Sequence, residues 1–98
     1  MALKTIPFEA AETLTDDASQ EELLADAFAS GDATYIAVAL GTVARARGMT
    51  SIAKDAGVTR EALYRALSKD GDPRLSTLMG TIKAMGLELH VRPTSPKG

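Results

Sequence analysis

The chain has 98 residues, a hydrophobic fraction of 45% and no cysteine. This composition predicts one globular domain with a single modest core, and it excludes a disulfide framework or thiol chemistry. The apolar runs are too short to span a membrane and no secretory leader is recognisable, so we expect a soluble protein with the cytoplasm as its default compartment.

The net charge is −2, but acidic and basic residues are distributed unevenly along the sequence. Residues 1–34 carry one cation and eight carboxylates, a net charge of −7, whereas residues 35–98 carry ten cations and five carboxylates, a net charge of +5. This division predicts a basic surface for phosphates and an acidic surface for a basic partner. The alternative is that the acidic residues only solvate an N-terminal helix and stabilise its first turns.

The first third of the sequence predicts an arm with a short helix, followed by a longer helix. A proline that suits a helix start precedes residues 8–14, so residues 1–18 are expected to form the arm with its short helix. The longer helix is expected to begin near Ser19, because Ser19 and Glu22 have the spacing of a capping box, and to end at Gly31.

A third helix is predicted from Asp32, a suitable capping residue, to Gly48. Gly41 inside it costs roughly 1 kcal/mol relative to alanine, which favours a close helix crossing at that point. Arg45 and Arg47 near its C-terminus suit the helix dipole, and that structural role is a sufficient reason for both.

A polar loop over residues 68–74 leads into the last helix, which is expected to end at Gly86. Asp70 and Asp72 in the loop lack the further ligands of a calcium site, so no metal is predicted. The helix carries apolar residues at helical spacing, which we expect to face the core: Leu75, Leu78, Met79, Ile82 and Met85.

Residues 87–92 alternate between apolar and polar side chains and predict one short strand that ends before Pro93. A single strand leaves its backbone groups unpaired, and no second strand is predicted in the chain. Its partner is therefore expected to be a second copy or another protein, with Leu87, Leu89 and Val91 marking the pairing strand. The tail to residue 98 is expected to be disordered.

The most informative stretch is residues 51–67, which predict two short helices joined by a tight turn. Ala53 is small where the helices must approach, Gly57 suits a left-handed turn, Val58 supplies an apolar plug and Thr59 suits a helix N-cap. This pattern is typical of a DNA-binding helix-turn-helix, although some helical hairpins without a nucleic-acid partner share it.

The outer side of this stretch carries the candidate DNA contacts. Helical spacing turns Leu63 inward and leaves arginines, a hydroxyl and a tyrosine outward, which suits a major groove and its phosphates. The predicted DNA-binding residues are Thr50, Ser51, Lys54, Thr59, Arg60, Glu61, Tyr64, Arg65 and Lys69.

Catalysis finds no support in the sequence. His90 is the only histidine, no nucleophile with a base is indicated, and no glycine-rich phosphate loop is present. We therefore predict no catalytic residue, no metal and no cofactor.

The sequence resembles the addiction-module antidote family, small antitoxins with a lambda-repressor-like (Xre-type) DNA-binding domain related to the HigA type. The resemblance covers nearly the whole chain, and its most specific part is Thr-Arg-Glu-Ala-Leu-Tyr-Arg-Ala-Leu-Ser at residues 59–68. Further matching blocks lie at residues 39–49, 52–54 and 77–87. The chain departs from the family at Asp72, where asparagine is usual, and at Leu75, where an aromatic residue is common.

This resemblance implies a type II antitoxin. Such a protein neutralises a small basic toxin of the RelE/ParE class and represses the shared operon by binding operator DNA as a homodimer. The implied fold is all-α, a five-helix lambda-repressor-like helix-turn-helix domain over residues 19–86, with one short C-terminal β-strand and a tail in residues 87–98. Two alternatives remain, a stand-alone regulator without a toxin and an interaction module that has lost DNA binding, which Glu61 and the negative net charge would suit.

Overall fold

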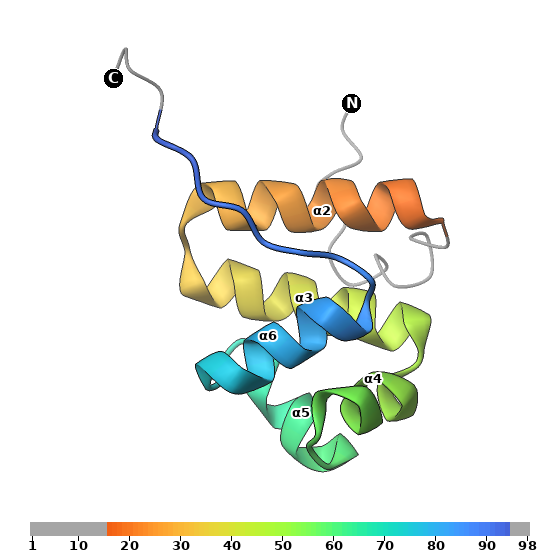
Figure 1. Ribbon diagram of the computed structural model, residues 1–98. Coiled ribbons are helices and arrows are strands. Elements are labelled where there is room, and N and C mark those ends of the chain that lie inside the picture. Colours follow the sequence, from red (N-terminus) through yellow and green to blue (C-terminus); the bar gives the residue numbers. More distant parts are fainter. Residues whose placement is uncertain (1–15, 95–98) are drawn as a thin grey trace.

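The computed structural model of the chain describes residues 16–94, and the short helix predicted over residues 8–14 lies outside this range. The described residues form five helices: α2 Asp17–Ser30, α3 Ala33–Arg47, α4 Met49–Ala56, α5 Arg60–Ala66 and α6 Leu75–Ala84 (Figure 1). Helix α2 packs on α3, α3 packs on α4, and α4 packs on both α5 and α6. The prediction of an all-α domain is confirmed for this part of the chain.

The core lies where α2 to α6 and the residue after α5 converge. Its largest fully buried side chains are Leu40, Val43, Leu63, Leu67 and Thr81. Helix α3 comes closest to the residue after α5 at Gly41. A glycine is required there, because a Cβ atom would lie 2.3 Å from the carbonyl oxygen of Leu67. The close crossing predicted at Gly41 is therefore confirmed.

Capping side chains define the starts of α2 and α3. The backbone N–H of Ser19 donates to the Asp16 carboxylate over 3.3 Å, so Asp16 is the N-cap of α2 and the predicted cap at Ser19 is wrong. Hydrogen bonds from the side chain and backbone of Ser19 lower the pKa of Asp16. Asp32 caps α3 as predicted, accepting from the backbone of Thr34 at 2.9 Å and of Tyr35 at 3.2 Å.

Helix α6 buries part of the predicted apolar stripe, with Ile82 and Met85 in the core and Leu78 packed against it. Leu75 and Met79 are 71% and 45% exposed, whereas Thr77 and Thr81 are buried. The Thr81 hydroxyl donates to the Thr77 carbonyl oxygen over 2.8 Å, which satisfies the polar group and allows the rest of the side chain to enter the core. The prediction that the whole apolar stripe of α6 faces the core is wrong for Leu75 and Met79.

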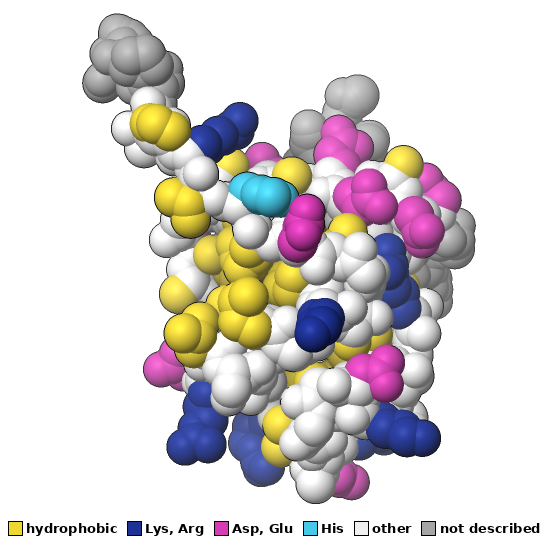
Figure 2. Space-filling view, viewed as in Figure 1, with side chains coloured by type: hydrophobic (Ala, Val, Ile, Leu, Met, Phe, Trp, Pro, Cys, Tyr) yellow, Lys and Arg dark blue, Asp and Glu magenta, His cyan; other side chains and the backbone are white. Residues whose placement is uncertain are grey.

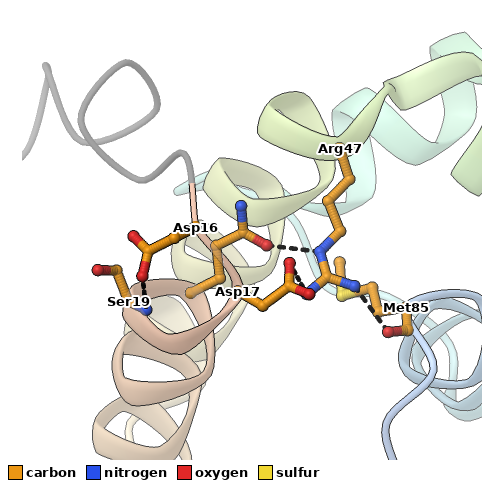
Figure 3. A network of polar contacts seen from close by, with 6 residues as sticks. Asp16, Asp17, Ser19, Arg47 and Met85 are labelled. Atoms are coloured by element: carbon orange, nitrogen blue, oxygen red, sulfur yellow. Dashed lines mark hydrogen bonds and ion pairs between the residues drawn. The ribbon is translucent and has the colours of Figure 1, made fainter.

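Arg47 joins three parts of the chain rather than only balancing the dipole of α3 (Figure 3). Its guanidinium donates to the Gln20 side chain over 2.5 Å and to the Met85 carbonyl oxygen over 2.7 Å, and it lies 3.4 Å from the Asp17 carboxylate. The network fastens the start of α2 to the end of α3 and to the turn after α6.

The segment after α6 is not a strand within the single chain. Gly86 ends α6 with a left-handed φ of 75°, and residues 87–94 then run across α2 in an extended path without secondary structure (Figure 1). The predicted C-terminal strand is therefore absent from this structure, because a strand needs a neighbour and residues 16–94 supply none.

Candidate nucleic-acid interface

The turn between α4 and α5 has the hydrogen bonding of a Schellman motif. Gly57 adopts a left-handed φ of 78°, its N–H donates to the Lys54 carbonyl, and the Val58 N–H donates to the Ala53 carbonyl over 3.0 Å. A side chain at position 57 would strain this backbone, and this explains the glycine. The left-handed turn predicted at Gly57 is confirmed.

Thr59 starts α5 as predicted. Its hydroxyl accepts a hydrogen bond from the Ala62 backbone N–H over 3.0 Å, and its carbonyl accepts from the Leu63 N–H over 3.0 Å. The cap fixes where the seven-residue helix begins, and hence which of its side chains turn away from the core.

The two sides of the α4–α5 unit separate as expected. Ile52 and Leu63 are buried, and Val58 packs against the core from a half-buried position. All nine predicted DNA-binding residues are exposed: Thr50, Ser51, Lys54, Thr59, Arg60, Glu61, Tyr64, Arg65 and Lys69. They are available to a partner, and their contact with DNA stays a prediction.

Tyr64 lies at the centre of a small cationic cluster. The guanidinium carbon of Arg60 is 5.8 Å from the centre of the Tyr64 ring, and that of Arg45 is 5.9 Å from the same centre. Both distances fall in the range of cation–π attraction. Arg60 precedes Tyr64 by one helical turn, whereas Arg45 comes from the last turn of α3.

Arg45 is the residue of this surface that sequence reasoning missed. Its place near the C-terminus of α3 predicts only a role at the helix dipole, because no spacing rule links it to a tyrosine nineteen positions later. Packing in three dimensions brings it beside α5, where its exposed guanidinium extends the candidate basic surface.

The charges of the described chain separate in space as they do along the sequence. Figure 2 shows several Lys and Arg side chains, with a few Asp and Glu side chains among them, around the end of the molecule formed by α5, and a group of Asp and Glu side chains over the start of α2. The exposed carboxylates of α2 are Asp17, Glu21, Glu22 and Asp26. A polyanion would therefore be attracted to the α5 end and repelled from α2.

No cluster of three or more His, Asp or Glu side chains in residues 16–94 is placed to hold a metal ion. None of the helices in this part of the chain has the length and apolar character needed to cross a membrane.

The model of a protein family described as probable addiction module antidote protein matches residues 4–93 of the chain. The chain belongs to this family. Membership supports an antitoxin role in an addiction module and implies a toxin partner, and antidote proteins are in general regulators rather than enzymes.

A relative of this antidote-family chain comes from Haemophilus influenzae, where it bears the name uncharacterized protein. The two sequences are 41% identical over 85 residues, which cover 87% of this chain and 88% of the relative. No solved structure matches the chain.

Proposed function

We propose that this antidote-family protein is a type II antitoxin that neutralises a small basic toxin of the RelE/ParE class and represses its own operon by binding operator DNA as a dimer. The observation that carries the DNA-binding part is the exposed basic surface on a capped α4–turn–α5 unit, with Tyr64 between Arg45 and Arg60. The glycine turn and the threonine cap support a lambda-repressor-like helix-turn-helix.

In the proposed complex, α5 enters the major groove and the basic side chains of its outer face hold the DNA. Arg60 and Arg65 are suited to base edges or phosphates, and the hydroxyl of Thr59 lies at the start of the helix, where phosphates commonly bind. Glu61 suits a cytosine amino group or orients Arg65 one turn later. Two copies would place their α5 helices about 34 Å apart, one turn of a palindromic operator.

The toxin is proposed to bind the acidic side of the molecule. The exposed carboxylates of α2 face away from the α5 end, so a basic protein bound there would leave the DNA surface free (Figure 2). Charge complementarity of this kind speeds association and excludes wrong partners.

The proposal is tested by co-expression with the basic reading frame of roughly a hundred residues that a toxin–antitoxin operon would place beside this gene. We expect the protein to restore growth to cells expressing that toxin and to co-purify with it. A second arm places the operon promoter before a reporter, which the protein should repress. Repression without rescue of growth would favour a stand-alone regulator. Rescue of growth without repression would contradict the proposal that the protein represses its own operon.

A further inference from the structure

The backbone of residues 88–94 is unpaired within the described chain. The Schellman turn at Gly86 ends with the Leu87 N–H donating to the Ile82 carbonyl over 3.1 Å, and no later residue up to 94 makes a backbone–backbone hydrogen bond with another residue of the range 16–94. Figure 1 shows this segment extended across α2. It thus offers a strand edge, which ends at Pro93 because proline has no N–H to donate.

Side-chain exposure alternates over residues 87–90, all of which border a shallow groove. Leu87 packs against the core and Leu89 is 39% exposed, whereas the side chains of Glu88 and His90 are 81% and 77% exposed and lie 3.1 Å apart. Side chains two positions apart share a face in an extended backbone, so this contact is the one a strand would make. Val91 is 99% exposed, which leaves a β-branched apolar side chain wholly in water.

From these observations we infer that residues 88–92 of two copies pair as antiparallel strands about a twofold axis at His90. This inference deepens the proposed function by naming the surface of the proposed dimer. Such a contact is isologous: each contact between one residue and a different residue of the second copy occurs twice, and only His90, on the axis, meets its own counterpart.

The register follows from the order of the side chains. An axis at His90 places Glu88 opposite Arg92 of the second copy and Leu89 opposite its Val91, and both contacts occur twice. Opposite charges and paired apolar side chains stabilise neighbouring strands. An axis at Leu89 would instead leave Arg92 opposite Gly86, and an axis at Val91 would set His90 against Arg92.

A two-stranded ribbon needs support, because such a pair is at best marginally stable by itself in water. The groove beneath Leu89 supplies this support. It encloses about 240 Å³ between α2, the end of α6 and the segment itself, and its apolar lining includes Leu24, Phe28, Ile82 and Leu87. Val91 of the second copy would meet Leu89 at the edge of this groove and leave solvent.

Charge reversal tests the pairing with residues that are exposed and therefore dispensable for folding. E88R and R92E each place two like-charged pairs in the ribbon, so we expect each variant to dimerise about tenfold or more weakly in sedimentation equilibrium. The double variant E88R/R92E should regain the parent affinity. An equimolar mixture of the two single variants should also dimerise, because both of its cross-strand pairs have opposite charges.

A cysteine scan tests the register, since the chain contains no cysteine of its own. H90C should form an interchain disulfide on mild oxidation, because directly opposed Cα atoms lie about 4.5–5.5 Å apart in antiparallel strands. L89C is the matched control and should crosslink much less readily.

A parent protein that is monomeric, single charge variants that dimerise as the parent does, or preferential crosslinking of L89C would each overturn the inference. The proposed function has its own readout in these variants. If the charge variants still bind the operon promoter as dimers, the proposed function is supported and the strand pairing is contradicted. If the parent protein is a dimer but binds no promoter DNA, the strand pairing remains possible and the proposed role as a repressor is contradicted.

Discussion

Arg45 in α3 and Tyr64 in α5 meet with the guanidinium carbon 5.9 Å from the centre of the aromatic ring. The contact joins the last turn of α3 to the outward face of the proposed recognition helix, and Arg60 approaches the same ring at 5.8 Å. The aromatic ring can thereby orient two cations toward the same polyanion.

The first prediction concerns this contact. Arg45→Ala should weaken binding to the operon promoter about tenfold and reduce the slope of log affinity against log salt by about 1, because one phosphate contact is lost. Fluorescence anisotropy at several salt concentrations measures both quantities. Lys83→Ala, which removes an exposed cation of α6, is the matched control and should leave the slope unchanged. An unchanged slope for Arg45→Ala would place Arg45 outside the interface.

The second prediction concerns the network around Arg47. Arg47→Ala removes the hydrogen bonds to Gln20 and to the Met85 carbonyl and leaves buried polar groups without this partner. The free energy of unfolding should fall by about 2–3 kcal/mol, which lowers the midpoint of thermal unfolding by roughly 10 °C or more in a domain of this size. Circular dichroism measures the change. Arg45→Ala should alter stability by less than about 0.5 kcal/mol, and equal melting of the two variants would contradict the structural role of Arg47.

The third prediction concerns the substitution Gly41→Ala. The sign of the change in the free energy of unfolding shows whether helix propensity or the contact with Leu67 dominates. Alanine in place of glycine inside a helix ordinarily gains about 1 kcal/mol. At this position the added Cβ would meet the Leu67 carbonyl oxygen at 2.3 Å, so Gly41→Ala should instead lower the free energy of unfolding by about 1–3 kcal/mol. Urea denaturation measures it, and a stabilised variant would show that α3 and the residue after α5 are not in close contact.

The fourth prediction concerns Tyr35, whose hydroxyl donates to the Asp26 carboxylate over 2.6 Å. This hydrogen bond raises the pKa of Tyr35 above its ordinary value, with smaller contributions from burial and from the charge of Asp26. The stabilisation is present below the unfolded pKa of about 10 and is lost as the pH rises through the higher folded pKa.

Absorbance at 295 nm measures this titration. The chain has two tyrosines, so in the Tyr64→Phe variant the signal comes from Tyr35 alone. Its midpoint should lie above 10 and should move down toward 10 when Asp26→Ala is added. A midpoint that does not respond to Asp26→Ala would contradict the contact between α2 and α3.

Local signals in the sequence predicted much of this fold. The turn and capping residues interact only with backbone groups close to them in the sequence, so their roles can be predicted without knowledge of the tertiary structure. These residues are Asp32, Gly57 and Thr59. The same local reasoning went wrong at Ser19, because Asp16 is also a good cap and lies three residues earlier. Competing signals of equal strength cannot be ranked from spacing alone.

The features of the fold and of the candidate site that the sequence did not predict depend on how the helices pack. Periodicity identified an apolar stripe on α6, but not the rotation that buries Thr81 and exposes Leu75. The places of Arg45 and Arg47 depend on contacts with residues distant in the sequence, which no local rule supplies. The strand predicted over residues 87–92 is not present in the single chain, and pairing of this segment between two chains stays a proposal.

The central claim is that the outward face of α5 binds the operon promoter, and the most direct measurement is the affinity of that DNA for the parent protein, Arg60→Ala and Arg65→Ala. Both arginines are exposed, so the variants should fold as the parent does, which circular dichroism verifies. Each variant should lose affinity by about 1–3 kcal/mol, roughly 5- to 150-fold. Parent protein that ignores the promoter at low salt, or two variants that bind it as tightly as the parent, would contradict the account.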